Sequence, residues 1–460
     1  MRRELSKSEV NLGPTRIVAL AFLTLIVLGT ALLMLPISAS SGDATDVVSA
    51  LFTATSATCL TGLIVVDTAT HWSAFGQIVV LSLIQLGGFG IMSLTSLAGM
   101  LLTGRIGLRS RLNASAEGRT LSPADVRRTI IATLVLTAVM EVAVACFLTF
   151  RFALGYDMSV GRAIYEGIFH SISAFNNAGF GLRSDNLIPY VGDAWIILPI
   201  SASLVIGGLG FPVLSELLGR ARNWLRRGEV VEDRKTERLS VTAKVTLIGT
   251  AILLTAGIAM VAVLEWNWAL AELSTKEKVF GAFFQGVTPR TAGFNSVDYA
   301  DFHPTTLMGT DILMFIGGGS AGTAGGLKIT TFAVLVAAIV AEFRSREVCT
   351  INQRSIDPSV VRQALAVAFA GITVVIIGIG ALRILEPAIN GDFIVFEVIS
   401  AFATSGLSTG ITAELSTPSK LILCFIMYFG RVGPITLVTA LGTRKVAARF
   451  QYPKERPFIG

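Results

Sequence analysis

Four long apolar runs divide the chain, and shorter segments of mixed apolar and polar residues lie between them. A run of about 20 apolar residues is long enough to cross a bilayer as an α-helix. The first run follows a basic N-terminus, as in a signal peptide, but it is longer than the h-region of about 7–15 residues in such peptides. It also begins a repeated pattern, which favours a retained helix. The runs predict outer membrane helices at about 15–38, 128–156, 242–266 and 361–386.

A shorter half-apolar segment of 13–16 residues follows each outer helix. Segments of this length are too short to cross the hydrocarbon core, so they predict re-entrant half-helices. A second apolar helix, the inner helix, then starts near His71, Asp193, Thr306 and Lys420. The predicted half-helices cover about 44–57, 160–175, 274–288 and 391–403.

One glycine stands at the same place in the turn after each half-helix: Gly62, Gly179, Gly293 and Gly406, spaced by 117, 114 and 113 residues. A second glycine cluster follows each turn, at 85–90, 206–211, 316–322 and 429–433. Internal repeats of this kind dictate the architecture. The prediction is an all-α membrane protein with eight spans, in which four parallel repeats of outer helix, pore helix, filter and inner helix surround one pseudo-fourfold pore. The predicted repeats cover 1–125, 126–240, 241–358 and 359–460.

Basic residues are distributed unevenly between the two sides that this topology defines. The side that holds both termini and the links between repeats carries 27 lysines and arginines, and the side of the half-helices carries 8. Positive charge accumulates in cytoplasmic loops. Both termini are therefore predicted to be cytoplasmic, with a C-terminal tail after the fourth repeat, and the turns are predicted to face outward.

Composition supports a membrane protein and excludes several other classes. Hydrophobic residues make up 52% and charged residues 15% of the 460 residues, and the mean hydropathy is +0.69. The net charge of +6 does not indicate nucleic-acid binding, because the basic residues lie between apolar runs without any DNA-binding motif. The four cysteines have no metal-site spacing, and no cluster of catalytic residue types indicates an enzyme or a cofactor.

The four turns have the chemistry of a cation filter. Irregular backbone at membrane depth is tolerated where it lines a water-filled path, and inward-facing carbonyl groups can replace the hydration shell of a cation. The C-terminal ends of the half-helices carry partial negative charge that favours a cation. Close helix packing is the alternative role for the glycines. The predicted K⁺-binding filter residues are Cys59, Leu60, Thr61, Gly62, Asn176, Asn177, Ala178, Gly179, Arg290, Thr291, Ala292, Gly293, Ala403, Thr404, Ser405 and Gly406.

The third inner helix contains six glycines within twelve residues, a density that breaks a helix. A loop at 317–328 is therefore expected inside the membrane. Arg431, in the fourth inner helix, would repel a cation and so form a barrier below the filter; its alternatives are a structural ion pair or a snorkelling side chain. Lys328 is either part of the same barrier or an interfacial anchor. The predicted gate residues are Gly317, Gly318, Gly319, Gly322, Gly325, Gly326, Lys328 and Arg431.

Few other polar side chains lie within the apolar segments. Glu141 in the second outer helix is expected to have a structural partner rather than to bind the ion. Glu166, His170 and Glu397 in the half-helices are expected to make structural hydrogen bonds. Only one glycine per turn is shared between repeats, which predicts few coordinating carbonyl rings and weak discrimination between K⁺ and Na⁺.

The chain resembles the Trk/Ktr/HKT superfamily of potassium transporters over nearly its whole length. The motifs that carry the resemblance are TGLIVVDT at 61–68, NNAGF at 176–180, RTAGFN at 290–295, GGGSAGTAGGLK at 317–328 and GRVGP at 430–434. The KtrB-like branch fits better than the TrkH branch, because the first repeat begins almost at the N-terminus. Cys59, Leu60, Thr404 and Ser405 depart from the commoner family residues.

The resemblance implies potassium uptake through a channel-like pore in the bacterial inner membrane, with Na⁺ as an activator. It further implies a homodimer with one pore per subunit and a cytosolic KtrA-like ring of nucleotide-binding regulatory subunits. In the family, the positions of the 317–328 loop and of Arg431 form the gate. The alternative function is a secondary transporter of another small cation or solute, although such folds usually contain inverted repeats rather than four parallel ones.

Overall fold

Each of the four long apolar runs forms a helix in the computed structural model, which describes residues 14–104, 123–225, 239–346 and 348–433. The predicted C-terminal tail, the N-terminal basic residues and much of the basic linkers lie outside these residues. Within the described part, four helices are long and apolar enough to cross a membrane, or five if one bent pair forms a single span. The outer helices are α1 (Pro14–Leu33), α5 (Pro123–Gly155), α9 (Val241–Leu264) and α13 (Pro358–Leu385).

The four short segments are also helical, close to their predicted bounds. Three of them begin at a residue whose side chain accepts hydrogen bonds from the first turn: Asp46, Ser274 and Asn390. Such N-caps satisfy main-chain N–H groups that otherwise lack a partner. The short helices are α2 (Val47–Cys59), α6 (Val160–Phe175), α10 (Thr275–Val287) and α14 (Gly391–Ala403).

Within the described residues, the inner helices are interrupted in two repeats, and the sequence predicted one of these interruptions. The predicted break in the third repeat is present, between α11 (Pro304–Phe315) and α12 (Ile329–Phe343). The second inner helix also bends, by 106° at Gly210, between α7 (Ala194–Leu209) and α8 (Phe211–Leu225). The sequence analysis had not indicated this second interruption. The inner helices of the first and fourth repeats are α3 (Ala74–Gly104) and α15 (Thr417–Val432).

Gly210 explains the second bend, because its φ of +89° is accessible to glycine and strained for other residues. Pro212 follows within the first turn of α8, where its missing N–H is tolerated. The remaining described elements are short: η1 (Pro36–Ser38), η2 (Ile188–Tyr190), η4 (Tyr299–Asp301), η5 (Ile411–Ala413) and an antiparallel hairpin of β1 (Thr350–Ile351) and β2 (Arg354–Ser355).

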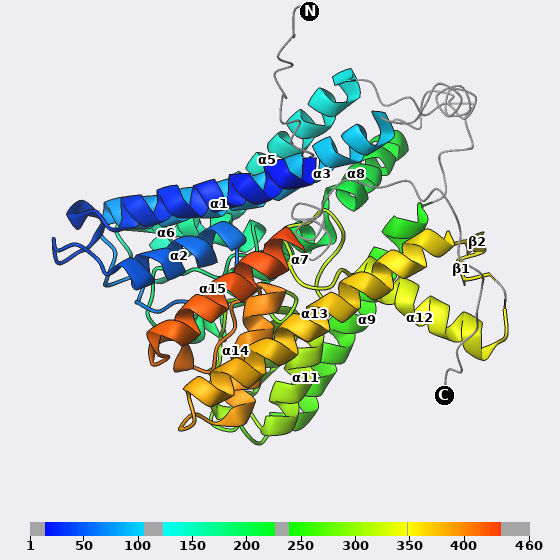
Figure 1. Cartoon of the computed structure of the whole chain (residues 1–460). Coiled ribbons are helices and arrows are strands. Elements are labelled where there is room, and N and C mark those ends of the chain that lie inside the picture. The colour runs from blue at the N-terminus through cyan, green and yellow to red at the C-terminus, as the bar shows by residue number, and fades with distance from the viewer. Residues whose placement is uncertain (1–13, 105–122, 226–238, 347, 434–460) are drawn as a thin grey trace, which may run out of the picture.

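The repeats pack around one another in a closed circuit. Each outer helix packs on the short helix of its own repeat, in the pairs α1–α2, α5–α6, α9–α10 and α13–α14. Contacts between successive repeats are made by α3–α6, α7–α10 and α11–α14, and α15–α2 joins the fourth repeat to the first (Figure 1). The short helices therefore lie inside the bundle, and their C-terminal ends can meet.

The outward surface of the outer helices is apolar. Val139, Val263 and Ile376 have exposed fractions of 59%, 77% and 62%. Large apolar side chains on a continuous exposed surface are typical of a membrane interface. This distribution fits a bundle that is surrounded by lipid.

Glycines of the second cluster pack the inner helices onto the short helices. At three of these glycines, an added Cβ atom would overlap a main-chain carbonyl oxygen of a short helix. The pairs are Gly87 with Thr58, Gly207 with Phe175 and Gly430 with Phe402, and each carbonyl lies four residues before a turn glycine. The structure therefore supports a role in close helix packing at these three positions.

Candidate functional site

The four turn glycines have left-handed backbone conformations. Their φ angles are +94° at Gly62, +71° at Gly179, +73° at Gly293 and +81° at Gly406. A side chain at such a position is strained, which is why glycine is needed there. The residue two positions earlier also has a positive φ in every repeat, namely Leu60, Asn177, Thr291 and Thr404.

This second left-handed residue ends the short helix in three repeats. In the first, the N–H of Thr61 donates to the Ser56 carbonyl at 2.8 Å and the N–H of Leu60 donates to Ala57 at 3.2 Å. These paired bonds define a Schellman motif, which satisfies carbonyl groups at a helix C-terminus. Equivalent pairs end α6 at Asn177–Ala178 and α14 at Thr404–Ser405. The chain therefore leaves α2, α6 and α14 through the same main-chain motif, two residues before the turn glycine.

The four turn glycines meet in a closed ring, and we refer to them as the ring glycines. A Cβ added to Gly62 would lie 3.2 Å from the Cα of Gly179, and one on Gly179 would lie 2.7 Å from the Cα of Gly293. A Cβ on Gly293 would lie 3.4 Å from the Cα of Gly406, and one on Gly406 would lie 2.9 Å from the Cα of Gly62. Main chains from four distant segments are therefore in direct contact around one centre.

The other predicted filter residues lie beside this ring, with side chains in different roles. Cys59 and Ala403 are the last residues of α2 and α14 and are buried in the core. Thr61, Ala178, Ala292 and Ser405, which precede the ring glycines, are also buried. The described residues contain no group of three or more His, Cys, Asp or Glu side chains that could hold a metal ion.

A cavity of about 520 Å³ opens on one side of the ring, and the ring glycines line it. Its walls are formed by the residues that follow each turn. They include the acidic residues Asp67, Asp185 and Asp298 and the basic residue Arg183. Arg183 is paired with Asp185 at 3.6 Å and donates to the Tyr190 hydroxyl at 2.6 Å. The cavity therefore has a net negative lining, which favours cations near the ring.

The glycine loop, residues 317–328 between α11 and α12, contains all six predicted gate glycines. Its two ends are joined by main-chain bonds: Gly317 donates to Leu327 at 2.8 Å, and Ile329 donates to Gly318 at 3.0 Å. The N–H of Gly319 donates a hydrogen bond to the carbonyl of Gly208, in the bent second inner helix, at 2.8 Å. The interruption of α11–α12 is therefore stabilised by the bend that follows α7.

The glycine loop also touches the end of α14, next to the ring. A Cβ added to Gly326 would lie 3.2 Å from the Cα of Ala403, and one on Gly325 would overlap the side chain of Thr404. Thr404 is two residues from the ring glycine Gly406. The loop is therefore in contact with one of the four glycine turns.

Arg431 binds this loop. Its side chain has an exposed fraction of 5%, and one guanidinium nitrogen donates to the Thr323 carbonyl oxygen. Its two remaining nitrogens have no hydrogen-bond partner among the described residues, and no described carboxylate forms an ion pair with it. The ion-pair alternative for Arg431 therefore has no support in the described part of the chain. Among the described residues, the Arg431 guanidinium therefore has no counter-ion beside the loop.

Two further cations reach the same loop. The guanidinium of Arg290, predicted as a filter residue, donates to the Gly317 carbonyl at 3.2 Å. Lys328 is partly buried, and its ammonium group donates to the Ala324 carbonyl. The sequence did not predict that Arg290 connects the third turn to the loop, because side-chain direction cannot be read from the RTAGF motif.

Glu141 has the structural partners expected of it. Its carboxylate accepts hydrogen bonds from Gln85 and Asn176, both at 3.1 Å. The Asn176 amide also donates to the Gln85 side-chain oxygen at 2.9 Å. Gln85 lies in α3, Glu141 in α5 and Asn176 at the end of α6. This cluster joins the first two repeats directly behind the second filter turn, and the sequence had not indicated Gln85.

The other polar residues of the short helices make hydrogen bonds, as predicted. Arg162 forms an ion pair with Glu166 at 2.8 Å, and His170 contacts the Glu166 carbonyl at 2.9 Å. The Thr412 hydroxyl donates to Glu397. These contacts hold the short helices in place and do not reach the ring glycines.

Comparison with known proteins defines the family. A family model described as "TrkH: Cation transport protein" matches residues 9–445. "Ktr system potassium uptake protein B" of Bacillus subtilis (strain 168) is 38% identical over 453 residues, which cover 98% of each chain. "Potassium/sodium uptake protein NtpJ" of Enterococcus hirae is 34% identical over 456 residues, with 98% of each chain covered.

The solved structures give the same fold. The crystal structure of the potassium transporter TrkH from Vibrio parahaemolyticus matches with a TM-score of 0.72 at 20% identity, over 96% of this chain and 87% of that one. Together these matches define a multi-spanning membrane protein of an ion-transport class, which confirms that it is not an enzyme. The chain belongs to the TrkH family of cation transport proteins, as the sequence motifs predicted.

Proposed function

We propose that this chain takes up potassium across the cell membrane through a channel-like pore whose filter is the ring of Gly62, Gly179, Gly293 and Gly406. The observation that carries the proposal is the closed ring of main-chain contacts between these four turns. Carbonyl groups arranged around one axis can replace the water that a K⁺ ion loses on entry. The names of the relatives in Bacillus subtilis and Enterococcus hirae, which are potassium uptake proteins, support this choice of ion.

The proposed filter uses the oxygens of residues 59–62, 176–179, 290–293 and 403–406. Helices α2, α6 and α14 end at these segments, and each C-terminus contributes about half a negative charge. The acidic cavity outside the ring raises the local cation concentration. Only a few carbonyl rings are available in turns this short, so the proposal includes modest discrimination against Na⁺.

The proposed gate is the glycine loop together with Arg431. The Arg431–Thr323 hydrogen bond supports this role, because it holds the loop with a positive charge that has no described counter-ion. A buried positive charge on the path of a cation raises the barrier to its passage. In this proposal, conduction requires the loop and the guanidinium to move away from the path below the ring.

The remaining features of the proposal concern partners and orientation. Both termini are cytoplasmic in the bacterial inner membrane, which the excess of basic residues on that side supports. The protein is a homodimer that is controlled by a cytosolic KtrA-like nucleotide-binding ring, and Na⁺ activates it. The Ktr-system name of the Bacillus subtilis relative supports a multi-component system, and the name of the Enterococcus hirae relative includes sodium.

Growth of a bacterium that lacks its own potassium-uptake systems tests this function. The chain should restore growth at micromolar to millimolar K⁺, and purified protein in liposomes should carry ⁸⁶Rb⁺ down a gradient. Flux that saturates with an organic solute and is independent of K⁺ would instead support a secondary transporter of that solute.

A further inference from the structure

The third turn, residues 290–293, leaves its short helix differently from the other three turns. The N–H of Arg290 donates to the Val287 carbonyl at 3.2 Å, and the N–H of Ala292 donates to the Thr288 carbonyl at 3.0 Å. These bonds differ from the paired Schellman bonds that end α2, α6 and α14. Among the four described turns, the third is therefore the one that a different set of main-chain bonds closes.

Side chains of the third short helix hold the segment that follows this turn. The Thr288 hydroxyl donates to the Phe294 carbonyl at 2.5 Å, and the Gln285 amide donates to the Val297 carbonyl at 2.7 Å. Thr288 and Gln285 are both fully buried. The position of Gly293, which immediately precedes Phe294, therefore depends on side-chain contacts as well as on the main chain.

Arg290 joins the same turn to the glycine loop. Its guanidinium donates to the Gly317 carbonyl at 3.2 Å, and the residue is only 8% exposed. A hydrogen bond from a charged donor is stronger than one between neutral groups, and burial limits competition from water. Gly317 begins the loop and also donates to Leu327 near the other end of the loop. The third turn is therefore bonded to the place where the two ends of the loop are joined.

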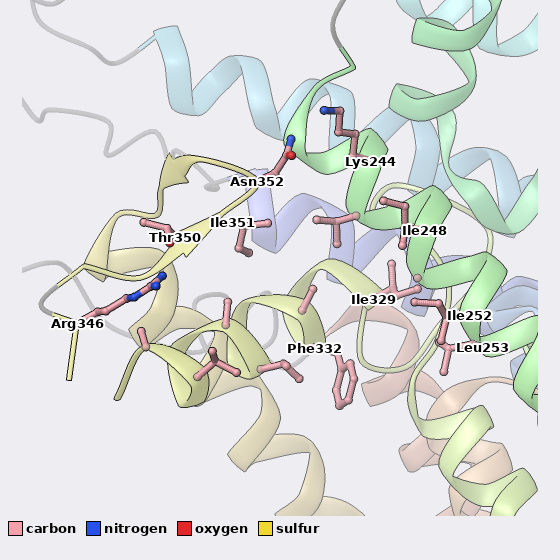
Figure 2. A pocket seen from close by; sticks show the side chains of 17 residues that line it. Lys244, Ile248, Ile252, Leu253, Ile329, Phe332, Arg346, Thr350, Ile351 and Asn352 are labelled. Carbon is pink, nitrogen blue, oxygen red and sulfur yellow. The ribbon is translucent and has the colours of Figure 1, made fainter. Parts of the chain in front are cut away.

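The loop has two further attachments, in its middle and at its far end. In the middle, the Thr323 carbonyl accepts a hydrogen bond from Arg431. At the far end, Ile329 of α12 is buried and points toward α9 (Figure 2), and a Cβ added to Gly249 of α9 would lie 2.6 Å from the Ile329 Cδ1 atom. Close-packed contacts of this kind resist displacement. A movement of the middle of the loop is therefore transmitted toward Gly317.

We propose that Arg290 couples the gate to the filter, so that displacement of the glycine loop shifts the third turn and changes the discrimination between K⁺ and Na⁺. This inference rests on the filter and gate proposed above. A shift of the third turn reaches both neighbours, because a Cβ on Gly293 would lie 2.8 Å from the Ser405 carbonyl oxygen and 2.9 Å from the Cα of Gly179. Arg290 is a positioning residue, which acts on the ion through the main chain of its turn.

Reversal potentials of the full-length protein in planar bilayers, with K⁺ and Na⁺ on opposite sides, test the coupling. Arg431→Ala releases the middle of the loop, and it should change the permeability ratio by at least about fivefold, the lower end of usual coupling between sites. Arg290→Met removes the charge and the donor while it keeps most of the side-chain length. In the Arg290→Met background, Arg431→Ala should change the ratio by less than about twofold. An equal change in both backgrounds would overturn the proposal.

Two variants control for the loss of a cation and for damage to the fold. Arg290→Lys keeps a positive donor, so Arg431→Ala should change the permeability ratio in this background as it does in the wild type. Lys420 also donates to a main-chain carbonyl, that of Ala413 at 2.9 Å, in the fourth repeat. Lys420→Met should therefore leave the effect of Arg431→Ala intact. A wild type that carries neither ion would contradict the proposed function and not the coupling.

Hydrogen exchange of the purified full-length protein tests the coupling without ion flux and without any change at Arg290. Arg431→Ala should speed amide exchange by at least about fivefold both in the loop, at 317–328, and in the third turn and the segment after it, at 290–297. The second turn, at 176–182, is closed by its Schellman bonds and should change by less than about twofold. Faster exchange in the loop alone, or in neither segment, would overturn the proposal.

Discussion

Replacing Gly293 with alanine should damage the filter, because the structure has main-chain atoms where the methyl group must go. The added Cβ would lie 2.8 Å from the Ser405 carbonyl oxygen and 2.9 Å from the Cα of Gly179. Neither neighbour is a flexible side chain, so one of the two adjacent turns must move. Gly293 also has a φ of +73°, which strains any residue that has a side chain.

The size of the effect follows from these two costs. A left-handed non-glycine residue costs about 1 kcal/mol or slightly more. Forcing an extra methyl group into a packed site costs about 1–3 kcal/mol. The sum is about 2–4 kcal/mol. If all of it opposes ion binding, the affinity of the filter for the ion falls by about 30- to 700-fold, at 1.4 kcal/mol per factor of ten.

Growth rescue and ⁸⁶Rb⁺ uptake in cells measure this loss, with surface expression quantified in parallel. The matched control is Gly410→Ala. Gly410 has a φ of +90°, so it carries the same backbone strain, but a Cβ there meets nothing within 4 Å. The control separates strain from contact with neighbouring turns.

Uptake by Gly293→Ala should fall at least about tenfold below that of Gly410→Ala at equal expression. Equal uptake by the two variants would refute the reasoning, because it would mean that contact between the turns does not matter for ion passage.

Three other outcomes follow from the same site. Arg431→Ala should raise ⁸⁶Rb⁺ flux in liposomes by at least about threefold, because it removes a buried positive charge and the bond to Thr323; unchanged flux would discredit the barrier. Glu141→Ala should lower the free energy of unfolding by about 2–4 kcal/mol, because Gln85 and Asn176 lose their acceptor. A structural role would be contradicted if thermal unfolding showed a smaller loss of stability than an alanine substitution at an exposed site. Reversal potentials in mixed K⁺ and Na⁺ salts should show only modest selectivity, because each turn is short, and a steep preference for K⁺ would count against that expectation.

Periodicity and length were sufficient to predict most of the helical architecture. The outer and short helices depend on apolar length and on N-cap residues, which can be read locally, and their predicted bounds agree closely with the structure. The glycine loop was equally accessible, because six glycines within twelve residues exclude a continuous helix. The division of the chain at 125, 240 and 358 and the number of spans stay predictions.

The bend at Gly210 was missed, although its signal is present. Gly210 is followed by Phe211 and Pro212, and a glycine before such a pair favours the end of one helix and the start of another. The cluster was instead interpreted in the same way as its counterpart at Gly87, whose helix continues to Gly104. The bend depends on main-chain bonds to a loop that lies more than 100 residues away in the chain, and no local pattern contains them.

The candidate site was predictable in its backbone and not in its side chains. Four glycines in register indicated a common function because the same φ is needed four times. The directions of Arg290 and of the Asn176 amide depend on neighbours in other repeats, namely Gly317 and Gln85. Such contacts are fixed by tertiary packing, so the sequence could name these residues as important without assigning their partners.

Anomalous diffraction from crystals of the full-length protein grown in Rb⁺ tests the central claim most directly. The account predicts a peak on the axis enclosed by the ring glycines, with main-chain oxygens of residues 59–62, 176–179, 290–293 and 403–406 as its ligands. A peak bound by side-chain carboxylates elsewhere, with none inside the ring, would contradict it.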